Sequence, residues 1–485
     1  MAKLEDSQFQ ADPAIGPDSD DPQAVGGAET SGNIFHRLYT DPWFQIVLIS
    51  MVCFCCPGMY NALTGMGGGG QVDPTVAANS AVALLSTGAV VAMFIAGPVY
   101  DLIGSRWSLL IGGWTYALYS GSLLNYNYTQ NAGFVIGSGA LLGIGAAFLW
   151  IPQGVIMTTY PPEKQRGRAI ALFWIIFNLG GGIGSLASFG INYNSTSGTV
   201  TNSTYIAYLV IMLFGWLIGF LFVCPPSKLN TRYHGERISH VQQEYEKLSV
   251  SKVIATAKFA FHTLIDWKLL VLLPMFFYAN IFYSYQQNSV NGETFNIRTR
   301  ALNSSLYWIA QMFGGFAMGG VLDIGSLHRK HRAMIGWVIL LVVGCCIWGG
   351  GYKFQVWNDN RTALGLKQDI DFKDKEYIGP MFLYIFYGMY DALWQGYCYW
   401  MIGAKSNSPA VSGILVGAYK TCQSCGGALS WRVNAVGVSA MRQLAMNWGL
   451  TVGTLAVAIP AVLTVSYSNE EQEVKWEKTD ENALE

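Results

Sequence analysis

Two ionisable side chains interrupt long apolar stretches in the C-terminal part of this 485-residue chain. Asp391 lies about fourteen residues into the stretch 377–404, and Lys420 lies about eleven residues into the stretch 409–431. Gln395 follows Asp391 by one helical turn and would share its face of a helix. A carboxylate that titrates beside an ammonium could couple two binding events. The alternative is a structural ion pair that fixes the packing of two helices.

Amide side chains occupy comparable places in other apolar stretches. These amides are Gln153, Asn178, Gln311 and Gln423. Amides orient a ligand in an apolar cavity, and they also join helices to one another. As a set with Asp391, Gln395 and Lys420, they predict a cavity for a small polar or amphipathic solute.

Acidic and basic residues recur together at the ends of two stretches. Asp101 and Arg106 belong to the segment Gly97-Pro-Val-Tyr-Asp101-Leu-Ile-Gly104-Ser-Arg106, and Asp323 follows the eighth apolar stretch. Pairing across helices at these turns would hold one conformation, so Asp101, Arg106 and Asp323 are predicted to form a cytosolic gate. The alternative is ordinary turn chemistry with positive charge retained in the cytosol.

Long apolar helices are needed to position these residues, and the composition agrees. Hydrophobic residues make up 52% of the chain and charged residues only 12%, about half of the roughly 25% found in soluble domains. The 55 glycines suit helices that pack closely in lipid. A net charge of −1 argues against a nucleic-acid partner. The composition therefore predicts an all-α integral membrane protein embedded in a lipid bilayer.

Twelve stretches are long and apolar enough to span a membrane as helices, which need about 20 residues each. The stretches are 43–63, 76–100, 107–124, 132–159, 168–191, 205–224, 267–290, 302–323, 333–351, 377–404, 409–431 and 443–467. Small residues at four-residue spacing, namely Gly139 and Gly143, Gly180 and Gly184, and Gly315 and Gly319, predict close packing between helices.

The polar connection 225–266 divides the twelve stretches into two sets of six. The predicted units are a disordered cytosolic tail (1–42), an N-terminal bundle (43–224), a cytosolic linker (225–266), a C-terminal bundle (267–467) and a cytosolic tail (468–485). The two halves share short sequence motifs, since Leu149-Trp150-Ile-Pro-Gln153-Gly154 resembles Leu393-Trp394-Gln395-Gly396. Two six-helix repeats of this kind place a binding site at their interface.

Basic residues and glycosylation motifs predict the orientation. In the first half, no Lys or Arg lies in the loops that a cytosolic N-terminus would place outside. The sequons begin at Asn127, Asn194, Asn202 and Asn360, and all four fall in loops on that predicted outer side. Both termini are therefore predicted to be cytosolic, in the plasma membrane or an endomembrane, and the protein is predicted to be a glycoprotein.

The segment Gly97 to Arg106 resembles the signature loop of the major facilitator superfamily, with Ser105 where a basic residue often stands. The helix count and the central linker match that fold. Asn61-Ala-Leu-Thr-Gly-Met-Gly67-Gly-Gly-Gly70-Gln and Gly388-Met-Tyr-Asp391-Ala-Leu-Trp-Gln395, with Tyr419-Lys420, resemble the uncoordinated-ninety-three-like branch. The resemblance implies two pseudo-symmetric bundles. Members of the branch are described as transporters, ion-channel regulatory subunits and trafficking chaperones of membrane receptors.

The function predicted is secondary transport of a small solute by alternating access, with protons or another ion as the coupling partner under consideration. The alternative is a non-transporting regulatory or trafficking subunit that binds an ion channel or receptor. No nucleotide, hydrolase or metal-protease motif is present, so no enzyme activity, cofactor or metal is predicted. Gly67–Gly70 is interpreted as a flexible outer turn.

Overall fold

The computed structural model describes residues 34–71, 74–161, 166–195, 199–225, 228–229, 232–233, 236–237, 265–405 and 409–466. Most of the predicted N-terminal tail, most of the linker 225–266 and the C-terminal tail lie outside the described residues. Helix α1 (Ile34–Thr40) crosses the boundary between residues 1–38 and the unit of residues 39–485. Within the linker, the two-residue strands β1 (Arg232–Tyr233) and β2 (Glu236–Arg237) pair in antiparallel fashion.

Twelve helical rods, some of them interrupted, follow one another through the described residues of the second unit. The first half contains α2 (Pro42–Cys53) with η1 (Phe54–Gly58) and α3 (Met59–Gly65), then α4 (Thr75–Phe94), α5 (Ala96–Thr129), α6 (Ala132–Thr159), α7 (Arg166–Ile191) and α8 (Asn202–Phe222). The second half contains α10 (Trp267–Leu270), α11 (Leu273–Tyr278), α12 (Phe282–Ser284) and η5 (Tyr285–Gly292) as one rod, then α13 (Ile297–Leu322), α14 (Arg329–Ala363), α15 (Ile378–Gly403), α16 (Pro409–Ala435) and α17 (Ala440–Leu463). Short 3₁₀ turns, η2 (Gly68–Gly70) and η6 (Lys375–Tyr377), precede α4 and α15.

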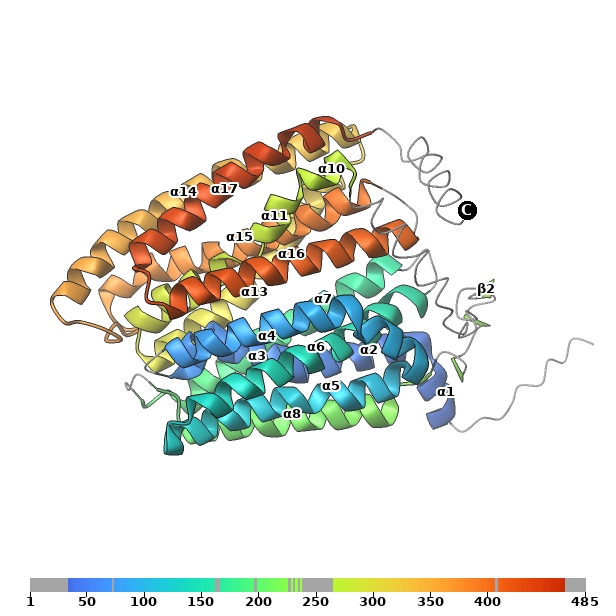
Figure 1. Ribbon diagram of the computed structural model, residues 1–485, viewed down its shortest axis with the longest axis horizontal. Helices are drawn as coiled ribbons and strands as arrows, with labels where there is room; N and C mark the ends of the chain where they lie inside the picture. The colour runs from blue at the N-terminus through green and yellow to red at the C-terminus, as the bar shows by residue number, and fades with distance from the viewer. Residues whose placement is uncertain are drawn as a thin grey trace, which may run out of the picture. The chain divides into compact units, whose positions relative to one another are not determined.

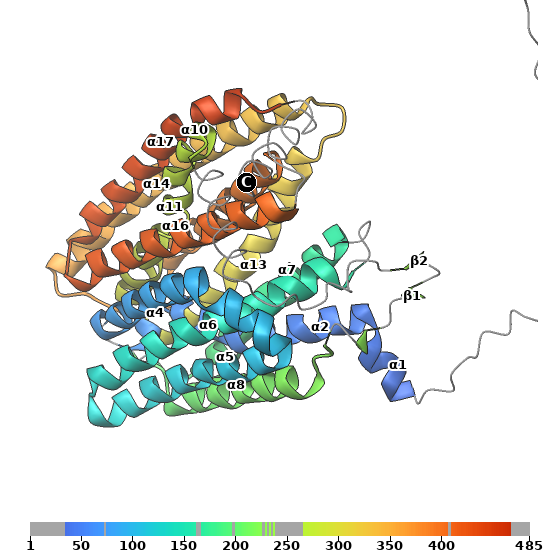
Figure 2. The ribbon, with the colours of Figure 1, turned by 45° about the vertical axis from the view of Figure 1, so that its right-hand side comes forward.

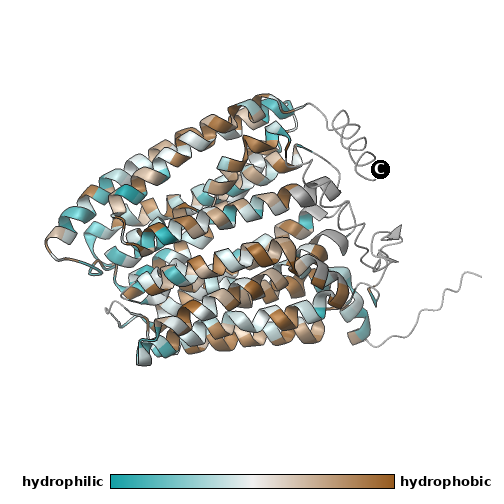
Figure 3. Ribbon diagram, viewed as in Figure 1, coloured by the Kyte–Doolittle hydropathy of each residue, from teal (hydrophilic) through white to brown (hydrophobic). Residues whose placement is uncertain are grey.

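The rods match the twelve predicted spans, and the predicted fold class is confirmed. Eight described helices are long and apolar enough to cross a membrane by length and composition. Helices α5, α13, α15 and α16 are not among the eight, and the last three carry Asp391, Lys420 and most of the polar residues around them. In Figure 3, apolar segments run along most helices and hydrophilic segments gather mainly toward helix ends.

Each half has its own hydrophobic core. One core gathers buried side chains from Leu269 to Val465, and the other gathers side chains from Ile46 to Leu229 with two residues of α13, Ile297 and Ala301. Helices α14 to α17 lie on one side in Figure 1, and α4, α5, α6 and α8 lie on the other. The two halves meet along two seams, α4 with α16 and α7 with α13.

Several helix ends differ from those predicted, because hydropathy marks the apolar part of a helix and not its hydrogen-bonded length. Helix α4 ends at Phe94, and α5 then continues through a sharp break at Gly104, whose φ of 75° suits glycine. Helix α14 runs on to Ala363, well past the predicted end of its span. The sequon residues Asn127, Asn202 and Asn360 therefore lie in α5, α8 and α14, so their predicted placement in loops is wrong.

The two ends of the helices are named here by what they carry. The sequon end bears Gly67–Gly70, Asn127 and Asn202, and the linker end bears Gly104 and Lys405. Hydrogen bonds that join the halves through described residues concentrate toward the sequon end. Examples are Trp308 Nε1 to the Asn61 carbonyl (3.2 Å) and Ser305 Oγ to the Gly182 carbonyl (2.9 Å).

Toward the linker end α7 and α13 diverge, as Figure 2 shows. In α13, Phe316 lies eleven residues after Ser305 on the same helical face, yet 85% of its surface is exposed. In α7, Ile175 precedes Gly182 by seven residues and is also exposed. Side chains on these inward faces are thus covered at the sequon end and uncovered toward the linker end.

Glycines permit close packing at some of the predicted places. A Cβ on Gly139 would lie 2.1 Å from Ser80 Oγ, and one on Gly180 would lie 2.7 Å from the Phe54 carbonyl oxygen. Gly315 and Gly319 have no such neighbour, since a Cβ on either would meet nothing within 4 Å. The prediction of close packing is therefore wrong for this last pair.

Candidate functional site

The seventh span is broken into short pieces, and side chains of other helices bind the carbonyls that the breaks leave free. Trp394 Nε1 donates to the Met275 carbonyl at 3.1 Å, and Gln395 Nε2 donates to the Ala279 carbonyl at 3.0 Å. Ser430 donates to the carbonyl of Ile281. Interrupted helices at the centre of transport proteins commonly form the solute or ion site. The first span of the other half is interrupted too, by η1 with its internal Pro57.

Asp391 lies beside this break and is almost fully buried. Its Oδ2 accepts hydrogen bonds from Tyr283 Oη (2.6 Å), Gln311 Nε2 (2.6 Å) and Tyr307 Oη (3.1 Å). Its Oδ1 accepts one from Gln395 Nε2 at 3.2 Å. These five residues are called the acid cluster. Four neutral donors from α12, α13 and α15 thus satisfy the carboxylate without a cation in contact.

Lys420 does not pair with Asp391 directly, and two amides lie between them. The Lys420 ammonium donates to Gln423 Oε1 (3.0 Å), and Gln423 Nε2 donates to Gln395 Oε1 (2.9 Å). Gln395 in turn donates to Asp391, and Tyr419 donates to the same Gln395 oxygen. Gln395 and Gln423, called the amide relay, are held in one orientation because each accepts from the lysine side and donates toward the acid.

Two other amides of the predicted cavity lie in the first half and stand apart from this cluster. Gln153 is half-buried on α6. Asn178 is buried on α7, and its Oδ1 has no hydrogen-bond partner among the described residues. A buried amide oxygen without a partner is costly in an apolar environment. Asn178 is therefore suited to a solute or a water that approaches from the seam.

The predicted gate residues have separate surroundings. Arg106 donates from Nε to the Phe220 carbonyl (3.1 Å) and from Nη2 to the Leu221 carbonyl (2.5 Å), so it binds the last turn of α8. Asp323 is exposed at the end of α13. The side chain of Asp101 lies outside the described part of α5.

At the sequon end, a buried arginine of the second half binds the glycine turn of the first. Arg300 of α13 is fully buried; its Nε donates to the Met66 carbonyl (2.6 Å), and its Nη2 donates to the carbonyls of Gly67 (2.5 Å) and Gln71 (3.3 Å). Asn288 Oδ1 accepts from the Gly68 amide at 2.7 Å. These contacts are called the sequon-end latch.

The four residues of the glycine turn adopt backbone angles that favour glycine. Residues Gly67 to Gly70 have φ values between 55° and 80°, which side-chain-bearing residues rarely adopt. A Cβ on Gly67 would lie 2.1 Å from the Gln287 carbonyl oxygen. Gly68, Gly69 and Gly70 are all buried. The turn is therefore buried and closely packed, and the predicted flexibility is wrong, while its predicted outer side stays a prediction.

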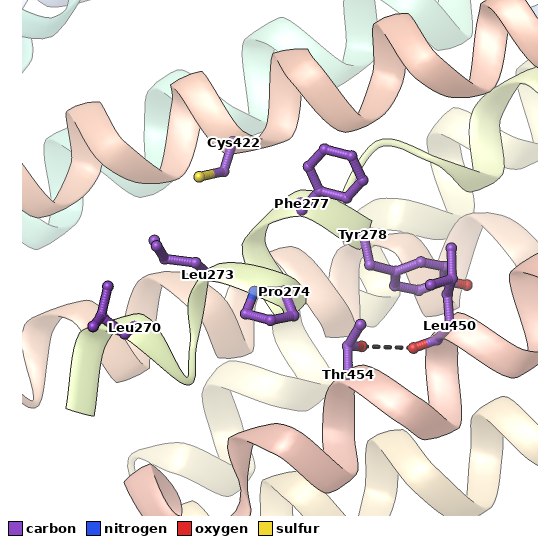
Figure 4. Close-up of a pocket in the computed structure, with 8 residues that line it drawn as sticks. All are labelled: Leu270, Leu273, Pro274, Phe277, Tyr278, Cys422, Leu450 and Thr454. Atoms are coloured by element: carbon purple, nitrogen blue, oxygen red, sulfur yellow. Dashed lines mark hydrogen bonds between the residues drawn. The ribbon is translucent and has the colours of Figure 1, made fainter. Parts of the chain in front are cut away.

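Two pockets accompany these features. An apolar pocket of about 440 Å³ lies between α10–α11, α16 and α17, where Leu270, Phe277 and Cys422 line it (Figure 4). A polar pocket of about 660 Å³ lies at the sequon end and includes Asn127 and Asn202. Those two sequon asparagines bond to each other, with Asn127 Nδ2 donating to Asn202 Oδ1 at 2.7 Å. Asn194 and Asn360 are exposed.

Sequence reasoning identified the acid and most of the amides, but it did not assign Tyr283, Tyr307 or Arg300 to the site. The chain contains 26 tyrosines, so nothing in the sequence distinguishes Tyr283 and Tyr307 from the others. Arg300 lies just before the apolar stretch 302–323 and resembled an ordinary loop charge. A charge beside an apolar stretch, together with a run of glycines elsewhere, is the signal that could have suggested the latch.

Comparison with known proteins agrees with this architecture. Residues 43–430 match the profile described as Major Facilitator Superfamily. The chain is 41% identical to UNC93-like protein 1 of Arabidopsis thaliana over 447 residues, which is 91% of this chain and 94% of that protein. It is 40% identical to an UNC93-like protein of Schizosaccharomyces pombe over 421 residues, covering 86% and 81% of the two chains. A solved D-xylose–proton symporter superposes with a TM-score of 0.58 at 14% identity, over 86% of this chain and 97% of that one.

Proposed function

Because this chain belongs to the major facilitator superfamily and to its UNC93-like proteins, we propose that it is a secondary transporter of a small solute. The halves would exchange access between the two ends of the seams, with the acid cluster as the coupling site. The observation that carries this proposal is a buried carboxylate, held by four neutral donors, beside the broken seventh span.

The donor set favours a proton as the coupling ion. Sodium and other hard cations need oxygen ligands, whereas Asp391 is surrounded by hydroxyl and amide groups that donate to it. Among the described residues, no group of three His, Cys, Asp or Glu side chains could hold a metal ion. A single proton on Asp391 would instead cancel the charge and disturb the bonds from Tyr283, Tyr307 and Gln311. Loss of those bonds would loosen the contact between α15 and its neighbours α12 and α13.

The separated seams support alternating access. Phe316 and Ile175 are exposed on faces that are covered further along the same helices, so the halves pack at the sequon end and part toward the linker end. With both termini and the linker in the cytosol, this would be an inward-facing arrangement. Asp101, Arg106 and Asp323 would then close the linker end in the opposite arrangement.

A non-transporting role remains the second candidate because α13 has an uncovered small-residue face. A Cβ on Gly315 or Gly319 would meet nothing within 4 Å, because this part of α13, like the exposed Phe316, lies on the face that the open seam uncovers. Small residues at this spacing permit another helix to approach closely. A partner membrane protein could therefore dock there without any solute moving.

Flux through reconstituted protein tests the proposal. The full chain is placed in proteoliposomes, and uptake of a broad solute panel is measured with and without an imposed pH gradient. We expect uptake that Asp391→Asn abolishes and that Tyr283→Phe lowers about tenfold, the effect of losing one hydrogen bond to a charged group. Tyr352→Phe is the matched control, since Tyr352 is exposed on α14. Variants are compared at equal amounts of folded protein, judged by elution as a single species.

If no solute of the panel shows a flux that Asp391→Asn lowers, the transport proposal is rejected. Co-purification of one membrane protein that Gly315→Leu releases would then favour the docking role. Retention of flux in Asp391→Asn with an unchanged pH dependence would instead reject the acid cluster as the coupling site.

A further inference from the structure

Lys420 faces the first half of the molecule and not the lipid. On the same face of α16, Gly427 lies seven residues later and Trp431 lies eleven residues later. Both contact α4: a Cβ on Gly427 would lie 2.9 Å from Leu85 Cδ1, and Trp431 packs with Ala78 and Ala81. Lys420 is therefore on the seam between α4 and α16, on its linker side.

Although it lies on the seam, Lys420 is exposed. The α4 face that covers Gly427 and Trp431 does not cover Lys420, just as the first half leaves Phe316 uncovered on the other seam. An ammonium in mid-membrane is costly unless it faces water or a partner. The uncovered seam supplies that surrounding, so the Lys420 ammonium points into the space between the halves.

The Lys420 ammonium has N–H donors that no described residue accepts. Of its three donors, one binds Gln423 Oε1, and the rings of Tyr399 and Tyr419 lie 5.6 and 5.4 Å away. No carboxylate of a described residue lies within ion-pair distance of it. Asp391 does not need this charge, because four neutral donors already satisfy its carboxylate.

We propose that Lys420 is the solute-binding cation of this chain and that the solute is a small organic anion, such as a carboxylate. This inference rests on the transport function proposed above. The anion would take the free donors of Lys420, with the partly exposed ring of Tyr399 beside it as an aromatic wall. The amide relay would connect that anion to Asp391. Binding of the anion would then depend on the charge of Asp391, and the charge of Asp391 would depend on binding of the anion.

Chemical labelling of Lys420 tests this assignment. The full chain in phosphatidylcholine liposomes is treated with trinitrobenzenesulfonate, an anionic amine reagent, and modification is measured residue by residue by mass spectrometry. Benzoate, benzamide and benzylammonium, which match in size and differ in charge, are added as competitors. We expect benzoate at about ten times its Kd to slow labelling of Lys420 about tenfold, because the fraction of unoccupied ammonium falls in that proportion. Exposed Lys375 on the sequon end serves as the internal reference, with no change expected.

Equal protection by benzamide, or no labelling of Lys420, would overturn the proposal. Protection by phosphatidylglycerol in the liposomes, but not by benzoate, would assign the site to a lipid headgroup and would also overturn it. Uptake provides a second readout, in which Lys420→Arg should retain anion flux and Lys420→Gln should lose it. Flux that depends on Asp391 but carries benzylammonium would leave the transport function standing and reject the anion.

Discussion

Substituting Gly67 with alanine should open the sequon end. The new Cβ would lie 2.1 Å from the Gln287 carbonyl oxygen and 2.8 Å from Gly292 Cα, whereas ordinary contacts begin at 3.4 Å. Both neighbours are backbone atoms of the other half, so the halves must part by about 1 Å to relieve the contact. Forcing an atom into packed space costs about 1–3 kcal/mol, which changes a conformational ratio about 5- to 150-fold.

Gly365→Ala is the matched control for backbone strain. Gly365 has a φ of 82°, similar to the 74° of Gly67, but a Cβ there meets nothing within 4 Å. Both substitutions place a side chain at a positive φ, which costs on the order of 1–3 kcal/mol. Only Gly67→Ala adds a collision across the halves, so only that variant should move the halves apart.

Electron–electron distance measurements can follow the opening. Spin labels are placed at Gly133 and Lys375, one on each half at the sequon end, by incorporation of a noncanonical amino acid because nine native cysteines would also react with thiol labels. Gly67→Ala should populate longer distances, and Gly365→Ala should keep the distribution of the unmodified chain. Identical distributions in the two variants would refute the reasoning that this turn holds the halves together.

Two further predictions concern the sequon end. Burial raises the pKa of Asp371, but hydrogen bonds from Arg298 (2.6 Å) and Asn296 (2.6 Å) outweigh burial and hold the pKa below its usual range. The stability it provides is then complete above the unfolded value of about 3.9 and is lost as pH falls through the lower folded pKa. Asp371→Asn should therefore lower the unfolding free energy by about 1–3 kcal/mol at pH 7. Calorimetry should show that this loss disappears in strong acid, where Asp371 is protonated. A loss of the same size in strong acid would contradict the prediction. Glycan occupancy, measured on peptides from a glycosylating cell, should be higher at exposed Asn194 and Asn360 than at the mutually bonded Asn127 and Asn202, and equal occupancy at all four would disprove it.

Hydropathy was sufficient for the fold because lipid leaves helices as the main solution for long apolar stretches. The same reasoning found Asp391, since an acid in such a stretch demands a partner. It could not tell that Lys420 is not that partner, because the orientation of Gln395 and Gln423 between them depends on how α15 and α16 pack. Arg300 and Gly67 are more than two hundred residues apart, and only tertiary structure brings them together.

The helix ends were hard to predict for a related reason. Helix α14 continues to Ala363 because its backbone hydrogen bonds do not stop where its apolar residues do. Gly104, by contrast, breaks α5 within a segment that hydropathy also divides. Backbone geometry and hydropathy agree at Gly104 and disagree at the end of α14. Only hydropathy can be read from the sequence, so only the first of these boundaries could be predicted.

The partners of Arg300 have a consequence for the conditions under which the sequon end stays shut. The carbonyls of Met66, Gly67 and Gln71 carry no formal charge and cannot be protonated at any physiological acidity. Dissolved salt reaches a fully enclosed guanidinium poorly. A neutral cell surface and an acidic organelle would thus leave these three bonds equally strong, so these bonds themselves would not sense the acidity of a compartment.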